Sequence, residues 1–201
     1  MSDDVRIGAI LLAAGRGTRF GARPKLVAPL GGLPMVRHAG LAIRRSRLRP
    51  AVAVIGGHAE AVRASLSGLD MRLIENPDHA AGLASSLRVG LAALPAAVEA
   101  VVVVLGDMPR VTEAHLDALA AAYAGAAPRP SAVVPVFEGR RGNPVLLNRA
   151  LLRDDLAALE GDAGAARLLA GRGDVLEIEG DPANLLDVDT PEALAAMVRR
   201  P

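Results

Sequence analysis

Residues 9–25 read AILLAAGRGTRFGARPK, an apolar run that breaks into glycines and then gathers four cations. Because the run ends in residues with little or no side chain, a ligand could approach the backbone, and exposed N–H groups in such a loop favour an anion. The cations are Arg16, Arg19, Arg23 and Lys25, and cations spaced through one loop suit a polyphosphate better than a single carboxylate. The stretch therefore predicts a phosphate-binding loop behind a buried strand.

Outward from this loop, aliphatic runs alternate with segments that have helical character. The sequence predicts strands at residues 5–12, 51–55, 71–74 and 101–105, and helices at 35–47, 58–66, 82–94 and 112–123. This alternation calls for a parallel sheet with helices on both faces. The connection at 13–33 is longer than most, which suggests function.

A different pattern follows the proline-rich linker at 127–130. Predicted strands at 132–137 and 143–147 are close enough for a hairpin, so the second half should add antiparallel or mixed strands. The remaining predictions are short helices at 151–159 and 164–169, a strand at 175–178 and a closing helix at 191–199. The expected fold class is α/β, a three-layer Rossmann-like sheet that is mostly parallel.

The composition limits the classes of function. The 23 basic and 22 acidic side chains leave a net charge of +1, and aromatics are 1% of the residues, so a nucleic-acid partner is not expected. Rare aromatics also require a core of Ala, Val, Leu and Ile that packs close to the backbone. Without cysteine, the chain can have no disulfide or zinc–thiolate site. The start of the chain resembles neither a signal peptide nor a membrane span, which predicts a cytoplasmic protein with no membrane partner.

Acidic side chains follow two of the apolar segments. Asp107 comes directly after a buried strand, where a carboxylate is costly unless it meets a cation, and Mg²⁺ held by carboxylates and substrate phosphates would fit. A turn or a helix cap is the other role open to Asp107. Asp187 and Asp189 should face one side of an extended segment, although Asp189 or Thr190 could instead cap the last helix. Parallel strands share one carboxyl edge, so the first loop, residues 82–86 and Asp107 should converge on one cleft.

The glycine loop does not fit two common nucleotide motifs. A dinucleotide-binding fingerprint, G-x-G-x-x-G, would need a third glycine where Phe20 stands. A Walker A loop would need Gly-Lys-Ser/Thr, which does not occur in the chain.

The loop instead resembles the signature of the MobA-like nucleotidyltransferase superfamily, which includes sugar-phosphate and cofactor nucleotidyltransferases. The resemblance rests on LAAGRGTRFG at 12–21 followed by Lys25, on Asn76-Pro77, GLASSL at 82–87, LGDMP at 105–109, GRRGNPV at 139–145, GDAGA at 161–165 and DVDTPE at 187–192. Within the superfamily the chain is most similar to the molybdenum cofactor cytidylyltransferases. Ala13-Ala14-Gly15 resembles the cytidylyl rather than the guanylyl enzymes, whereas Asn143 stands where that family more often has histidine.

This resemblance implies transfer of CMP from CTP to the terminal phosphate of molybdenum-molybdopterin, with Mg²⁺ as cofactor. The products would be molybdopterin cytosine dinucleotide and pyrophosphate. A single domain, residues 1–201, would have a nucleotide-binding half at 1–126 and an acceptor-binding half at 127–201. A molybdenum-dependent oxidoreductase would be a partner.

The resemblance also implies the roles of the site residues. Nucleotide binding falls to Ala13, Ala14, Gly15, Gly17, Arg19, Lys25, Gly82, Ser85 and Ser86. Acceptor binding falls to Arg140, Arg141, Asn143 and Asp162. Metal binding falls to Asp107 with Asp187 or Asp189, and catalysis to Arg19, Lys25 and Asp107.

Two other functions stay open at this level. An enzyme with the same fold could use a sugar phosphate or another phosphorylated metabolite as acceptor. A non-catalytic protein could hold the mature cofactor and hand it to an oxidoreductase. The histidines, including His79, are scattered along the sequence and are predicted to lie at the surface or in helices without a ligand role.

Overall fold

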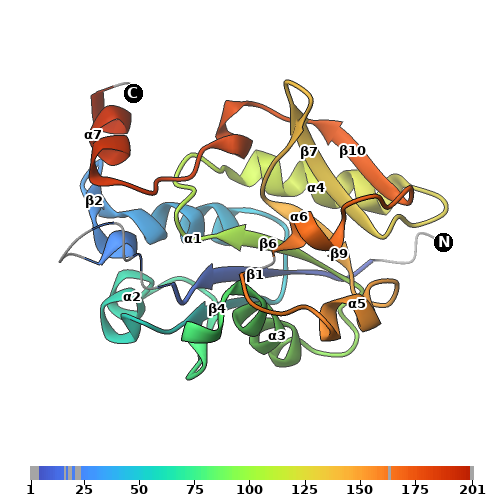
Figure 1. Cartoon of the computed structure of the whole chain (residues 1–201), viewed down its shortest axis with the longest axis horizontal. Helices are drawn as coiled ribbons and strands as arrows, with labels where there is room; N and C mark the ends of the chain where they lie inside the picture. Colours follow the sequence, from blue (N-terminus) through green and yellow to red (C-terminus); the bar gives the residue numbers. More distant parts are fainter. Residues whose placement is uncertain (1–4, 16, 18–19, 21–23, 163, 200–201) are drawn as a thin grey trace.

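The chain folds around one central sheet, seen in a computed structural model that describes residues 5–15, 17, 20, 24–162 and 164–199. Within these residues the sheet has eight strands in the order β10-β7-β9-β6-β1-β4-β5, with β8 paired to β7 (Figure 1). The strands are β1 Ile7–Ala13, β4 Ala51–Ile55, β5 Arg72–Glu75, β6 Ala100–Leu105, β7 Ala132–Phe137, β8 Arg140–Arg141, β9 Val145–Asn148 and β10 Val175–Glu179.

The direction of the strands changes between the two halves of the chain. β1 pairs in parallel with both β4 and β6, and β4 pairs in parallel with β5. β9 lies antiparallel between β6 and β7, and β10 returns parallel to β7. A tight turn at 138–139 pairs β7 with the short β8. The prediction of a mostly parallel sheet with a mixed second half is therefore confirmed.

Helices cover both faces of the sheet, which gives the predicted three layers. They are α1 Met35–Arg45, α2 Ala59–Ser65, α3 Leu83–Ala93, α4 Glu113–Gly125, α5 Arg153–Ala157, α6 Ala165–Leu168 and α7 Pro191–Arg199. Side chains of α1, α2 and α4 pack into one core cluster, and side chains of α3, α5 and α6 pack into another. Alternation along β1 feeds both clusters, because Leu11 faces the first and Ile10 the second.

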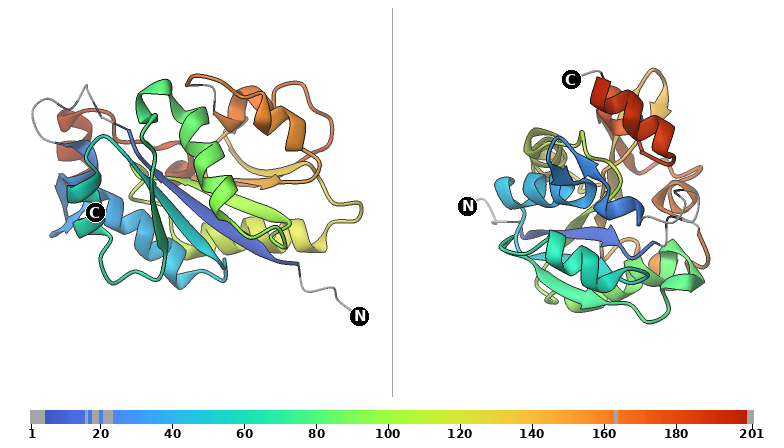
Figure 2. Two further views of the ribbon diagram at one scale, coloured as in Figure 1. Left: turned by 90° about the horizontal axis from the view of Figure 1, so that it is seen from below. Right: turned by 90° about the vertical axis from the view of Figure 1, so that its left-hand side faces the viewer.

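Close backbone packing takes the place of aromatic side chains in these clusters. α3 crosses β1 and β4 at Gly90, where an added Cβ would lie 2.8 Å from the Ile10 Cγ2 atom. Only a residue without a side chain lets the helix approach the strand this closely. The left-hand view of Figure 2 is seen from below, and α3, in green, lies in front of the sheet there.

Arginine side chains donate hydrogen bonds to carbonyl groups at or near the C-terminal ends of three helices. Arg49 donates hydrogen bonds to carbonyl groups at the end of α1, Arg129 to those at the end of α4, and Arg149 to those at and beyond the end of α3. A cation at a helix C-terminus binds carbonyl groups that lack helical partners and opposes the negative end of the dipole.

Short elements in the long connection bring the C-terminal helix to the first loop. The connection contains a 3₁₀ turn, η2 Lys25–Val27, and a small hairpin of β2 Pro29–Leu30 and β3 Leu33–Pro34, none of which the sequence predicted. Phe20, Met35 and Val188 form a third buried cluster, against which α7 packs (Figure 1). Val188 and α7 are thereby held beside the first loop and the start of α1.

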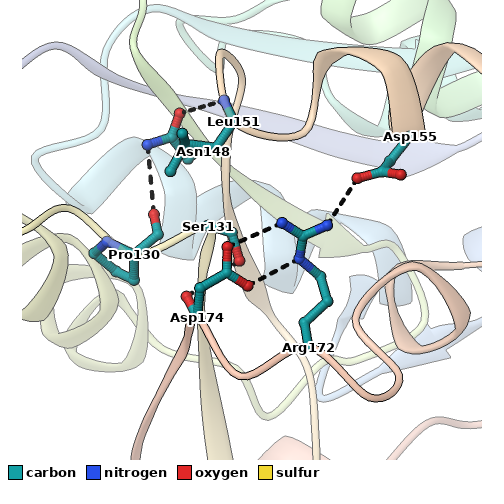
Figure 3. Close-up of polar contacts among 7 residues, drawn as sticks. All are labelled: Pro130, Ser131, Asn148, Leu151, Asp155, Arg172 and Asp174. Atoms are coloured by element: carbon teal, nitrogen blue, oxygen red, sulfur yellow. Dashed lines mark hydrogen bonds and ion pairs between the residues drawn. The ribbon is translucent and has the colours of Figure 1, made fainter.

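An arginine clamp fastens the second half of the sheet. Arg172 donates two hydrogen bonds to Asp174 at 2.9 and 3.0 Å and one to Asp155 in α5 at 2.8 Å (Figure 3). Ser131 donates to the Asp174 carbonyl group, which ties the start of β7 to the segment before β10. In the part of the chain that the structure describes, no helix is long and apolar enough to cross a bilayer.

Candidate active site

A cavity of about 530 Å³ opens at the carboxyl ends of β1 and β6. Its described lining consists of Leu12, Ala14, Gly15, Gly17, Lys25, Leu26, His79, Ala80, Gly82, Leu83, Ser86, Leu105, Gly106, Asp107 and Asp162. The first loop, the start of α3 and the end of β6 thus meet in one place. The topology of a parallel sheet predicted this convergence.

The glycine loop leaves room for a ligand at the cavity wall. An added Cβ at Gly15 would meet no atom within 4 Å, so the backbone there is open to a bound group. Lys25 packs over Gly17, where an added Cβ would come within 2.6 Å of the Lys25 Cβ atom. Ala13 lies inside β1 and is buried rather than lining the cavity. Arg19 lies outside the described residues.

Lys25 is held between two carboxylates from distant parts of the chain. Its Nζ atom donates hydrogen bonds to Asp107 Oδ2 at 2.6 Å and to Asp189 Oδ1 at 2.7 Å, and the residue is only 8% exposed. Burial by itself lowers the pKa of Lys25, but the carboxylates of Asp107 and Asp189 outweigh burial and raise this pKa above its usual value. The ammonium group is therefore firmly protonated.

The other carboxylate oxygen of Asp107, Oδ1, does not contact Lys25 in this way. Asp107 Oδ1 is buried and accepts no hydrogen bond from any residue that the structure describes. A buried, unpartnered carboxylate oxygen is costly, and such atoms are found where a ligand or cation completes the site.

The two candidate aspartates at 187 and 189 lie in different surroundings. Val188 between them is buried, and its N–H donates to the Asp107 carbonyl group at 3.0 Å. Thr190 Oγ1 accepts a hydrogen bond from the Ala193 N–H, so Thr190 caps α7 while Asp189 reaches Lys25. Asp187 is exposed, and the described residues include no group of three or more His, Cys, Asp or Glu side chains that could hold a metal ion.

The start of α3 is covered by a segment from the second half. Gly82 has φ +101°, and an added Cβ would lie 2.3 Å from the Gly161 carbonyl carbon and 2.8 Å from the Asp162 nitrogen. The Ala84 N–H donates to the Gly161 carbonyl group at 3.0 Å. This close contact places Asp162 on the cavity wall, as one of the four residues predicted to bind the acceptor.

The other three predicted acceptor residues lie apart from the described lining. Arg141 donates to Glu177 Oε1 at 2.8 Å and to the Leu169 carbonyl group at 3.0 Å, so its guanidinium group already has partners in the second half. Arg140 is exposed in β8, and the Asn143 backbone is bound to Asn184. The structure therefore joins only Asp162 of this set to the cavity.

Asn76 organises the two predicted serines. Its buried Nδ2 atom donates to Ser85 Oγ at 2.6 Å and to Ser86 Oγ at 3.0 Å, and Ser85 in turn donates to the Asp78 carbonyl group. Of the two serines, Ser86 lines the cavity. His79 also lines it, although the sequence suggested no role; its place after the turn that ends β5 is the signal that could have found it.

A mostly parallel sheet with a glycine-rich first loop, a buried lysine and a carboxylate at one edge is typical of α/β proteins that bind phosphate groups. The chain belongs to the MobA-like NTP transferase domain family, whose model matches residues 9–177. It is thus a nucleotidyltransferase of the MobA-like family, as the sequence predicted.

Solved structures with the same fold include Rv0371c from Mycobacterium tuberculosis H37Rv. It is 29% identical, covers 97% of this chain and 98% of its own, and has a TM-score of 0.84. The structure of Rv0371c in complex with manganese is 30% identical, covers 98% of this chain and all of that one, and has a TM-score of 0.80.

Curated relatives bear two different names. The bifunctional protein GlmU of Kineococcus radiotolerans is 36% identical over 153 residues, 75% of this chain, but the chain spans only 28% of the length of that relative. The nicotine blue oxidoreductase of Paenarthrobacter nicotinovorans is 28% identical over 198 residues, which is 94% of each chain.

Proposed function

We propose that the chain transfers CMP from CTP to the terminal phosphate of molybdenum-molybdopterin, giving molybdopterin cytosine dinucleotide and pyrophosphate. The observation that carries the transfer chemistry is the cluster of Lys25, Asp107 and Asp189 beside the glycine loop. The choice of CTP is supported by the Ala13-Ala14-Gly15 sequence, and the choice of acceptor by the GDAGA block, whose Asp162 lines the cavity.

The proposed cofactor is Mg²⁺, held by Asp107 and Asp189. Both side chains offer carboxylate oxygens, and Asp107 Oδ1 accepts no hydrogen bond from the described residues. Mg²⁺ suits one or two carboxylates together with substrate phosphates, and the manganese complex of Rv0371c supports a divalent cation here. Once bound, such a cation would offset negative charge on the α-phosphate and on the leaving pyrophosphate.

The residues of the chain itself supply position and charge. The open backbone at Gly15 admits the phosphates, and Lys25, with the proposed help of Arg19, places positive charge beside them. Since the attacking phosphate is already an anion, the reaction needs no general base from the protein. The barrier lies in bringing two polyanions together, which positioned cations lower.

The remaining residues shape the two ends of this site. Gly82 and Ser86 are proposed to face the base and ribose, with Ser85 held beside them through Asn76. In the proposed acceptor half, residues 127–201, Asp162 is the one of the four proposed acceptor-binding residues that lines the cavity. Arg140, Arg141 and Asn143 are proposed to contact the pterin end of the acceptor farther from the cavity.

The test is an assay of pyrophosphate release and of dinucleotide product by chromatography, with Mg²⁺, molybdenum-molybdopterin and each of CTP, GTP, ATP and UTP. We expect product with CTP. Absence of pyrophosphate with every nucleotide from a folded chain would refute transfer, and product with GTP alone would refute the choice of base.

Two variants relate the activity to the cluster. Asp107→Asn keeps the shape of the side chain but removes its charge, and loss of one such contact costs about 10²–10³ in rate. Asp154→Asn makes the same chemical change at an exposed position in α5 and should keep wild-type activity. Equal rates for the two variants would show that Asp107 has no part in the reaction.

Other functions are separate outcomes of the same assays. A sugar phosphate in place of the pterin would reveal a different acceptor. The likeness to a nicotine blue oxidoreductase over 94% of each chain supports oxidoreduction as a second candidate, which oxidation or reduction of nicotine blue without pyrophosphate release would favour. Binding without turnover would favour a cytoplasmic carrier that delivers its cofactor to a molybdenum-dependent oxidoreductase.

A further inference from the structure

Lys25 occupies the space between two carboxylates in the way that a metal ion would. Its ammonium group is 2.6 Å from Asp107 Oδ2 and 2.7 Å from Asp189 Oδ1. These two aspartates follow Lys25 in the chain by 82 and 164 residues. Two carboxylates this close to one point repel each other unless a cation lies between them. The pair is therefore a place where a cation binds, and Lys25 occupies it.

Lysine is an unusual residue in this chain, which otherwise uses arginine as its basic residue. The sequence has 22 arginines and a single lysine, which is Lys25. A guanidinium group is planar and binds a carboxylate through two parallel hydrogen bonds, whereas an ammonium group is a compact point charge on a flexible stem. An ammonium group resembles a metal ion more closely and can leave the carboxylates more easily.

The ammonium group of Lys25 also has a second possible binding partner, the phosphates of a nucleotide. It lines the same cavity as Ala14, Gly15 and Gly17, where the phosphates of the nucleotide are proposed to bind. A triphosphate in that cavity would attract the ammonium group away from the carboxylates. Asp107, whose Oδ1 atom already lacks a partner among the described residues, would then be left with both oxygens open to another cation.

We propose that Lys25 and a divalent cation are alternative occupants of the Asp107–Asp189 pair, and that nucleoside triphosphate drives the exchange by taking Lys25. The proposal rests on the proposed nucleotidyl-transfer site, but concerns how that site loads. Its consequence is coupling: metal and nucleotide each bind weakly alone and strengthen one another. Such coupling is reciprocal and typically amounts to about 5–150-fold in affinity.

The first measurement is binding of Mn²⁺ by electron paramagnetic resonance, with and without a CTP analogue that has a methylene group between its α- and β-phosphates. In the wild type we expect the analogue to tighten Mn²⁺ binding by about tenfold or more, within the usual range of coupling. Lys25→Met removes the competing ammonium, so this variant should bind Mn²⁺ more tightly than the wild type without the analogue. Lys25→Arg, which keeps the charge, should bind Mn²⁺ more weakly than Lys25→Met.

The second measurement follows the wild-type protein alone, so it does not depend on whether a variant folds. Lysine labelled with ¹³C at Cε gives one signal from this chain, because Lys25 is its only lysine. Mg²⁺ alone at low concentration should leave the signal in place, whereas Mg²⁺ with the analogue should shift it.

Equal Mn²⁺ affinity for wild type and Lys25→Met, or a lysine signal that does not respond to joint addition, would overturn the exchange. Neither measurement needs an acceptor or turnover. If the transfer assay fails but metal and nucleotide still strengthen each other's binding, the proposed function is refuted and the exchange is supported. If transfer occurs without this coupling, the exchange is refuted and the proposed function is supported.

Discussion

Replacing Gly82 by alanine tests whether the second half of the chain builds the wall of the cavity. Gly82 has φ +101° and ψ −179°, a conformation that is almost restricted to glycine. An added Cβ would also lie 2.3 Å from the carbonyl carbon and 2.4 Å from the oxygen of Gly161. Real Cβ atoms do not approach backbone atoms so closely, so either α3 or the 161–162 segment must move.

The size of the effect can be worked from these two contributions. The backbone conformation costs a residue with a side chain about 1–3 kcal/mol. Crowding against backbone atoms adds about 1–3 kcal/mol if the neighbours stay where they are. Residues 161 and 162 are exposed and can yield, so we expect Gly82→Ala to lower the free energy of unfolding by about 2–4 kcal/mol.

Movement of the 161–162 segment should also harm the reaction. Asp162 and Gly82 both line the cavity, and a displacement of about 1 Å in a positioning group can cost about 10²-fold in rate. The assays are urea unfolding followed by circular dichroism, and pyrophosphate release. We expect both stability and kcat/KM to fall.

Gly68→Ala is the matched control. Gly68 also has positive φ, +75°, but an added Cβ there would meet no atom within 4 Å. This variant should show only the cost of the left-handed backbone, about 1–2 kcal/mol, with normal kcat/KM. If the two variants had the same free energy of unfolding and the same kcat/KM, the contact between Gly82 and Gly161 would not shape the site.

Three further predictions concern the scaffold. Tyr123→Phe removes the oxygen that accepts the 2.8 Å hydrogen bond of the buried Asn148 amide, so the free energy of unfolding should fall by about 1–2 kcal/mol in urea. Arg149→Met removes the hydrogen bonds that Arg149 donates to the Leu91 carbonyl group in the last turn of α3 and to the Val98 carbonyl group beyond it, and should cost about 1 kcal/mol, measured in the same way. Burial acts to raise the pKa of Asp181, but hydrogen bonds from His115 and from backbone N–H groups outweigh it and hold this pKa below its usual value. The stability that Asp181 contributes should therefore be present above about pH 4 and be lost as the pH falls through the lowered pKa of the folded state.

Asp181→Asn checks the last of these predictions in unfolding series between pH 3 and 6. The difference in stability from the wild type should be small, about 0.2–1 kcal/mol, because the carboxylate is half exposed and screened by solvent. A difference that stays constant down to pH 3 would contradict the linkage. Wild-type stability in Tyr123→Phe or Arg149→Met would show that water replaces the lost partner.

The succession of elements could be predicted from the sequence because its causes are local. Runs such as Val101–Leu105 have no polar side chain and are too short for most helices, so they read as buried strands between amphipathic helices. Glycines at the end of the first run and Asp107 at the end of the fourth marked the carboxyl edge where the cavity lies. The class of site follows from these features, since a parallel sheet brings the ends of its strands together whatever the details.

Only the tertiary structure chose among residues with the same local signals. Asp187 and Asp189 differ little in sequence context, yet the structure places Asp189 against Lys25 and leaves Asp187 exposed. In the same way, Arg141 is bound by Glu177, and its sequence block gave no sign of that. Packing between segments that lie 36 and 164 residues apart in the chain makes these choices, and no local pattern along the chain encodes the distance between them.

The stretch at 9–25 shows both sides of this division. Its apolar run and its glycines determined by themselves that a strand would end in an open loop. Whether Lys25 would point into solvent, onto a phosphate or between two carboxylates depended on where β6 and the segment before α7 came to lie. The sequence supplied the cation, and the fold supplied its two partners, because electrostatic contacts form wherever folding brings opposite charges together.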